Sequence, residues 1–180
     1  DVSSVGGVHG AGGDFLADHT TTSFAALRAS ARQLVALVAV GSVEPHGPHL
    51  PLGTDTVISA AAAHRAVAKL RAQGVEALVA PPFPYGVTDF AEGFAGAVSL
   101  PAAALTAALE ALVGSLLRAG FDHVCLVNNH LEPAHDVAVR AAITSAPSGR
   151  ASVACPLTRR WARTLSPEFK SGACHAGRYE

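Results

Sequence analysis

Residues 34–56 read LVALVAVGSVEPHGPHLPLGTDT. The first seven are all apolar, which is typical of a strand that is buried on both faces of a parallel sheet. The loop that follows places one Glu, two His and one Asp among Gly and Pro. Carboxylate oxygens and imidazole nitrogens are metal ligands, and Gly and Pro restrict how the loop can hold them. We therefore interpret residues 41–56 as a metal-binding, hydrolytic loop that leaves the end of a buried strand.

The composition is that of a globular chain with a substantial core. Of the 180 residues, 49% are hydrophobic and 15% are charged, and the formal net charge is −1. This balance lacks the basic excess that nucleic-acid binding requires. No apolar run is long enough for a membrane span, and no secretory signal is visible. Three scattered cysteines do not form a disulfide framework, which fits a reducing cytoplasm. From these features together we expect a cytoplasmic protein without membrane or nucleic-acid partners.

Short apolar segments alternate with segments of helical periodicity along the chain. Residues 1–22 are interpreted as a loose lead-in and residues 23–180 as a single domain. Strands are predicted at residues 34–40, 75–80, 95–100, 124–127 and 151–155, with Pro81 and Pro82 ending the second. Helices are predicted to start at Ser23, at residue 54, at Pro101 and at Pro133. This alternation predicts an α/β fold in which helices cover both faces of a parallel sheet.

Candidate metal ligands follow two of the predicted strands. They are Glu44, His46, Asp55, His130 and Glu132. Residues two apart in an extended chain point to the same side, so each loop presents one imidazole with one carboxylate. Two such pairs, with Asp55 between them, suit two divalent ions about 3.5–4 Å apart. Each residue alone also has an ordinary explanation, such as helix capping, but five on two strand-exit loops favour a metal site.

Three motifs resemble those of the creatininase family. Residues 41–56 resemble its signature loop, residues 128–132 (NNHLE) its second metal-binding motif, and residues 175–180 (HAGRYE) its third. They occur in the family's order. The resemblance implies a three-layer α/β/α sandwich with a mostly parallel central sheet, assembled as a homohexamer. It also implies two divalent metal ions, Zn and/or Mn, with Fe as a further option.

The resemblance implies a ligand set for each ion. Glu44, Asp55 and His130 would hold one ion, while His46, Asp55 and Glu132 would hold the other, so that Asp55 is the bridge. A hydroxide between the metals would attack the carbonyl of an amide.

The resemblance also assigns the residues around the reacting bond. His175 would contact the substrate and pass a proton to the leaving nitrogen, with Glu132 as an alternative proton carrier and Glu180 supporting His175. His49 is interpreted as a residue that orients a metal ligand. His135 is interpreted as a residue on a helix face.

The substrate is expected to differ from creatinine. Creatininases carry a Tyr where this chain has Leu131 and a Trp where it has Ser171, so these two residues are expected to shape a different substrate pocket, and creatinine hydrolysis should be negligible. The expected function is an amidohydrolase that cleaves a C–N bond, other than an ordinary peptide bond, in a small cyclic or linear amide. The alternatives are a peptidase that trims a mycofactocin-type precursor and a catalytically silent metal-binding or scaffold protein. Because the sequence stops on the last residue of the third motif, we expect a C-terminal segment to be missing.

Overall fold

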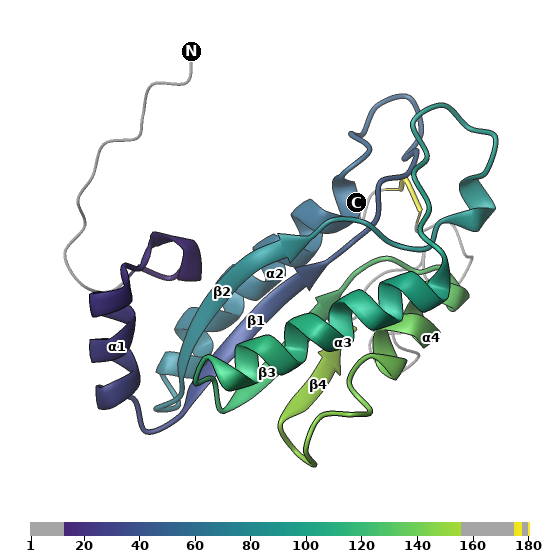
Figure 1. Cartoon of the computed structure of the whole chain (residues 1–180). Helices are drawn as coiled ribbons and strands as arrows, with labels where there is room; N and C mark the ends of the chain where they lie inside the picture. Colours follow the sequence, from purple (N-terminus) through teal and green to yellow (C-terminus); the bar gives the residue numbers. More distant parts are fainter. Residues whose placement is uncertain (1–12, 156–174, 178–179) are drawn as a thin grey trace.

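The computed structural model describes residues 13–155, 175–177 and 180. Helices and strands alternate along them (Figure 1). The elements are η1 (Leu16–Asp18), α1 (Thr21–Ser30), β1 (Leu34–Val40), α2 (Thr54–Arg71), β2 (Glu76–Phe83), η2 (Asp89–Ala91), α3 (Ala102–Arg118), β3 (His123–Asn128), α4 (Pro133–Ala141) and β4 (Ala151–Ala154). None of these helices is both long and apolar enough to cross a membrane.

The four strands form one sheet in the order β2-β1-β3-β4, and every neighbouring pair is parallel. All seven residues of β1 are buried, as expected for a central strand that is covered on both faces. Val40 of β1 is the register partner of Asn128 of β3. The two strands therefore end at the same level, and the loops that follow them begin side by side.

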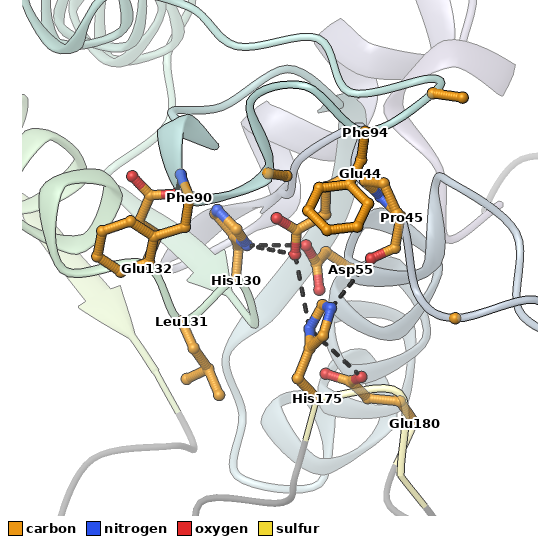
Figure 2. A pocket seen from close by; sticks show the side chains of 13 residues that line it. Glu44, Pro45, Asp55, Phe90, Phe94, His130, Leu131, Glu132, His175 and Glu180 are labelled. Carbon is orange, nitrogen blue, oxygen red and sulfur yellow. Dashed lines mark hydrogen bonds and ion pairs between the residues drawn. The ribbon is translucent and has the colours of Figure 1, made fainter.

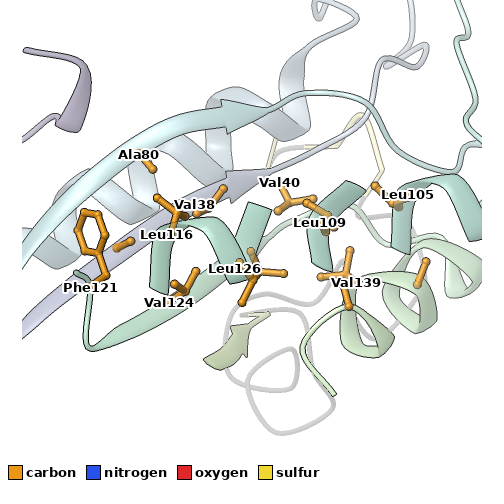
Figure 3. Close-up of a cluster of buried hydrophobic side chains, with 14 of the residues drawn as sticks. Val38, Val40, Ala80, Leu105, Leu109, Leu116, Phe121, Val124, Leu126 and Val139 are labelled. Atoms are coloured by element: carbon orange, nitrogen blue, oxygen red, sulfur yellow. The ribbon is translucent and has the colours of Figure 1, made fainter. Parts of the chain in front are cut away.

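Helices cover both faces of the sheet, which gives the predicted three layers. Alternate residues of β1 belong to two separate cores because successive side chains of a strand point to opposite faces. Leu34, Ala36, Val38 and Val40 join the core under α3 and α4 (Figure 3), whereas Val35 and Leu37 pack with residues of α2. In α3, Leu105 and Leu109 are fully buried, and burial of each leucine stabilises the fold by roughly 1.5–3 kcal/mol.

Two predictions about strands were wrong. Pro81 and Pro82 lie inside β2 instead of ending it. Since β2 is at the edge of the sheet and both prolines are exposed, the missing backbone N–H groups cost little there. Residues 95–100 do not form a strand, because Val98 and Ser99 make only isolated bridges.

The start of α1 also differs from the prediction. Thr20, and not Ser23, is the residue that caps the helix. Ser23 accepts a hydrogen bond from the backbone N–H of Thr20, while the Thr20 hydroxyl accepts one from the backbone N–H of Ser23. This reciprocal pair is a capping box. Ser23 therefore lies in the first turn of α1, three residues after the residue that caps the helix.

Candidate metal centre

The loops after β1 and β3 are held together by one hydroxyl group of α2. The Ser59 hydroxyl donates to the carbonyl of Val40 (2.8 Å) and accepts from the backbone N–H of Asn129 (3.1 Å). Gly41 allows the chain to pass the start of α2, because a Cβ at this position would lie 2.3 Å from Oγ1 and 2.6 Å from the backbone nitrogen of Thr56. The ends of both strands and the first turn of α2 thus form one packed unit.

One group of ligand atoms forms where these elements meet. Nδ1 of His130 lies 3.1 Å from Oε1 of Glu44 and 3.0 Å from Oδ2 of Asp55, and all three residues are buried. Figure 2 shows these side chains pointing toward one another. The second oxygen of Glu44 accepts a hydrogen bond from the Thr88 hydroxyl. This contact fixes the carboxylate, and sequence reasoning missed Thr88 because it lies outside the three motifs.

A second group shares Asp55 with the first. Nε2 of His46 lies 3.3 Å from Oδ1 of Asp55 and 3.7 Å from Oε2 of Glu180. The two oxygens of Asp55 therefore face two different histidines. This is the geometry that a bridging carboxylate requires.

The orientation of each histidine is set by a backbone carbonyl. His46 donates from Nδ1 to the carbonyl of Glu44 (3.1 Å), and His130 donates from Nε2 to the carbonyl of Val87 (2.8 Å). A carbonyl oxygen only accepts, so the ring nitrogen that faces it carries the hydrogen. The other nitrogen of each ring is left to face the carboxylates, as in histidines that bind metals.

The charges of the group call for a cation. Burial alone would lower the pKa of His130, but contacts with Asp55 and Glu44 raise it to about 10. Burial would likewise lower the pKa of His46, but contacts, chiefly with Asp55, raise it to about 9. Burial would raise the pKa of Asp55, but the two imidazoles bring it down to about 2. The buried carboxylates thus require positive charge beside them, which protons or metal ions supply.

The donor atoms fit a divalent metal. Oδ2 of Asp55 is buried and has no hydrogen-bond partner among the described residues, although the His130 ring is in contact with it. Within the described part of the chain, Glu44, Asp55 and His130 form one group whose ligand atoms all lie within 4.8 Å of one another, and His46, Asp55 and Glu180 form another. Mixed imidazole and carboxylate ligands suit Zn²⁺, Mn²⁺ and similar ions.

His175 lies on the open side of this centre. It donates from Nε2 to the carbonyl of Pro45 (3.0 Å), while Nδ1 lies 3.8 Å from Oε1 of Glu44. Its side chain is 52% exposed, and its ring lies 4.4 Å from that of His46 between centroids, with the two planes tilted by 42°. Ala176 has a φ of 53°, an uncommon value for a residue with a side chain, and donates its backbone N–H to Glu180. His175 and Glu180 of the third motif thus both lie beside residues of the first.

A cavity of about 760 Å³ opens over the ligand groups. Its charged floor includes Glu44, Asp55 and His130, and the apolar side chains of Phe90, Phe94 and Leu131 lie around these residues (Figure 2). Phe90 is 80% exposed and Phe94 is 66% exposed. These aromatic rings were not anticipated from the sequence, because single Phe residues in a loop carry no distinctive pattern.

Glu132 lines the same cavity without joining the described ligand groups. Its two oxygens accept the backbone N–H groups of Asp89 (3.2 Å) and Phe90 (3.4 Å), at the start of η2. The i, i+2 pattern therefore brings Glu44 and His46 together, 3.8 Å apart, while Glu132 points to η2. Its role as a ligand stays a prediction.

The other predicted residues are placed less centrally. His49 is exposed and makes no hydrogen bond or ion pair within the described residues, so the structure does not bring it to the ligand rings. Ser171 lies outside the described residues. His135 lies on the inward face of α4, and its side chain is buried against β3 and the loop after β2. It shares the inward stripe of α4 with Ala138, Val139 and Ala142, a spacing that was readable from the sequence.

The chain is thus an α/β protein with a parallel sheet. A buried cluster of carboxylates and histidines beyond the strand ends is its candidate metal centre. The profile of the creatininase family, described as creatinine amidohydrolase, matches residues 17–180. The chain therefore belongs to the creatininase family.

Individual relatives agree with this assignment. The mycofactocin precursor peptide peptidase of Mycolicibacterium smegmatis is 48% identical over 98 residues, which are 52% of this chain and 38% of that protein. The creatinine amidohydrolase of Pseudomonas putida is 31% identical over 110 residues, which are 58% of this chain and 40% of that protein. The matched regions thus cover about two fifths of the length of these relatives.

The fold is also found in solved creatininase structures. A crystal structure of creatinine amidohydrolase superposes with a TM-score of 0.75 at 23% identity, over 91% of this chain and 68% of that one. A structure described as "Creatininase Mn" gives a TM-score of 0.74 at 23% identity with the same coverage. The three-layer α/β fold is thereby confirmed.

Proposed function

We propose that this chain is a metal-dependent hydrolase of C–N amide bonds. The observation that carries the proposal is the pair of contacts made by Asp55, with one oxygen toward His46 and the other toward His130. A carboxylate between two imidazoles suits two neighbouring divalent ions. Ions held there supply Lewis acidity, which activates water and polarises an amide carbonyl. The donor set favours Zn²⁺ or Mn²⁺, with Fe²⁺ as a further option.

The first ion is assigned to Glu44, Asp55 and His130, and the second to His46, Asp55 and a further carboxylate. We assign that carboxylate to Glu132. Its hydrogen bonds to the backbone N–H groups of η2 are long, so a metal ion competes with them readily. Oε2 of Glu180 lies near His46, but it already accepts the N–H of Ala176, and burial raises the pKa of Glu180.

Two matched variants test this choice. We expect Glu132→Gln to bind one ion per chain and Glu180→Gln to bind two, as counted by elemental analysis after gel filtration. If Glu180→Gln is the variant that loses an ion, Glu180 is the ligand and Glu132 holds only η2.

His175 is assigned to proton transfer. Its hydrogen bond to Pro45 leaves Nδ1 directed toward the Glu44 and Glu180 carboxylates at the cavity floor, and half of its side chain is open to solvent. A histidine in this position is able to donate a proton to the leaving nitrogen, which departs poorly as an anion. Glu180 supports the turn that holds His175, through the N–H of Ala176.

The shape of the cavity favours a peptide over a compact amide. A volume of about 760 Å³ is larger than one small cyclic amide needs, and Phe90, Phe94 and Leu131 offer apolar contact beside the charged floor. The similarity to a mycofactocin precursor peptide peptidase supports the same choice. The preferred substrate is therefore an amide bond near the end of a peptide with apolar side chains, and a small linear or cyclic amide is the second candidate.

Hydrolysis with and without a chelator tests the proposal. Purified protein loaded with Zn²⁺ or Mn²⁺ is expected to cleave peptides with apolar ends, to lose the activity in a chelator and to regain it when the metal returns. Creatinine is expected to remain unchanged. Activity that survives complete metal removal would contradict the proposal. Two bound ions without turnover on peptides or small amides would favour a metal-binding scaffold. Homohexamer formation and a cytoplasmic location remain further predictions.

A further inference from the structure

His135 is a fully buried histidine that the proposed chemistry does not use. It lies in the first turns of α4, with no exposed surface, and both of its ring nitrogens are hydrogen-bonded. Nδ1 accepts the backbone N–H of Val87 (3.2 Å), and Nε2 lies 3.2 Å from Oδ1 of Asn128. A buried polar ring with both positions satisfied joins the loop after β2 to the end of β3.

The partners of His135 determine where its hydrogen lies. A backbone N–H only donates, so Nδ1 of His135 is the bare, accepting nitrogen. Nε2 therefore carries the hydrogen and donates it to Oδ1 of Asn128. The amide of Asn128 is oriented consistently, since its Nδ2 donates to the carbonyl of His130 (3.1 Å).

These contacts close a ring of hydrogen bonds around His130. The ring nitrogen Nε2 of His130 donates to the carbonyl of Val87, the same residue whose N–H is held by His135. The backbone N–H of His130 donates to Oδ1 of Asn128 (3.0 Å), the same atom that His135 contacts. His135 thus holds both groups that fix the His130 ring and the His130 backbone.

The imidazole ring of His135 has little room to shift. The planes of His130 and His135 meet edge to face at 77°, with centroids 4.6 Å apart. On the other side, a Cβ added to Gly86 would lie 2.5 Å from Nδ1 of His135 and 2.8 Å from the carbonyl oxygen of Gly41. Gly86 is therefore needed for the close approach of its loop to the His135 ring.

We propose that His135 is a positioning residue for the metal ligand His130, which it keeps with Nε2 hydrogen-bonded to Val87 and Nδ1 directed at Glu44 and Asp55. This inference rests on the proposed metal centre. Outer partners of metal-binding histidines typically contribute 10–100-fold in metal affinity. His135 acts one step further out, through the backbone of Val87 and the amide of Asn128.

Two substitutions separate hydrogen bonding from packing. Gln at position 135 carries an acceptor and a donor at about the spacing of the two imidazole nitrogens, whereas Phe fills the volume without either. We expect Zn²⁺ affinity, measured by competition with a chromophoric chelator, to fall about tenfold in His135→Phe, the lower end of the range for a direct outer partner, and to stay within about threefold of wild type in His135→Gln. His64→Phe, on the exposed side of α2, is the matched control and should bind Zn²⁺ normally.

A spectroscopic measurement on the unmutated protein covers the case in which His135→Phe fails to fold. Nitrogen-15 NMR of the Zn²⁺-loaded chain should show His135 with hydrogen on Nε2 only and His130 with hydrogen on Nε2. Hydrogen on Nδ1 of His135 would exclude its hydrogen bond from the N–H of Val87 and overturn the inference. So would folded His135→Phe with wild-type Zn²⁺ affinity, or equal losses in the Gln and Phe variants. Absence of Zn²⁺ binding in wild type would instead overturn the metal centre, and this inference with it.

Discussion

The candidate metal centre has a buried side and an exposed side that are built in different ways. Asp55 and His130 are 1% and 3% exposed and lie on elements packed against the sheet. The His175 side chain is 52% exposed and lies 3.8–3.9 Å from its carboxylate neighbours. Under the proposed function, the buried side would hold the ions and the exposed side would meet the substrate. Each of the following predictions breaks one side and leaves the other in place.

Loss of the bridging carboxylate should have the largest effect. Asp55→Asn removes the charge that faces both histidines, so we expect both ions to be lost and activity to fall to background. The fall in metal affinity should exceed the roughly 10–100-fold that an outer partner contributes. Metal content and peptide hydrolysis measure the two effects. The control is Asp136→Asn, which removes a half-buried pair with Arg140 on α4, outside the two ligand groups. An Asp55→Asn protein that keeps two ions would exclude Asp55 as the bridge.

Loss of the exposed imidazole should separate turnover from binding. His175→Ala should retain both ions and lose activity by about 10²–10⁴-fold, the usual contribution of a general acid. His130→Ala is the opposite case, because it should lose the first ion as well as activity. Elemental analysis beside steady-state kinetics distinguishes them. If His175→Ala loses its metal, the division between the two sides is wrong and His175 is a ligand.

The buried side should also make stability depend on pH. His46 and His130 have pKa values of about 9 and about 10 in the folded chain, above the ordinary value of 6.5. Between pH 6.5 and about 9, the folded chain keeps protons on these two histidines that the unfolded chain has released. The free energy of unfolding of the metal-free chain should therefore be highest below pH 6.5 with respect to these groups, and fall as the pH rises through about 9.

Metal binding displaces the same protons, so Zn²⁺ affinity should rise with pH and the loaded chain should not show this decline. Denaturant unfolding between pH 6 and 10, with chelator and with Zn²⁺, makes the comparison. Equal pH dependence in both conditions would show that the imidazoles do not bind the ion.

The apolar wall should have the smallest effect, and it should appear in binding alone. Phe90→Ala removes an exposed ring beside the floor of the cavity, so KM for a peptide with an apolar end should rise about fivefold, while kcat and metal content stay unchanged. Val137→Ala removes another exposed apolar group, from α4, and serves as the control. A fall in kcat would place Phe90 in the chemical step instead.

The sequence was most informative where one local pattern determined the structure. The apolar run of β1 identified a doubly covered strand, with the observed limits of residues 34–40. The rule that ligands follow the ends of parallel strands correctly brought Glu44 and His130 together. The ends of β2 were misjudged because the cost of a proline depends on whether its strand lies at an edge, which is a property of the whole sheet.

The contacts of Glu132 were less predictable for a similar reason. Both backbone N–H groups that hold Glu132 come from η2, more than forty positions earlier in the chain. Such a partner is fixed by the path of a loop and has no local signature. His135 was different, because it shares its helical spacing with the buried residues Ala138 and Val139 of α4, although the sequence interpretation named no side of the helix.

The carbonyl partners of the three histidines have a consequence for protein engineering. The acceptors belong to the main chain of Glu44, Val87 and Pro45, so no amino-acid replacement at those positions deletes them. Alanine at Val87 or Pro45 would therefore leave the orientation of the His130 or His175 ring in place, whereas alanine at Glu44 would keep the main-chain acceptor but remove a proposed metal ligand. Replacement of an inward-facing carboxylate would therefore change the ligand set without removing the main-chain contacts that orient the rings.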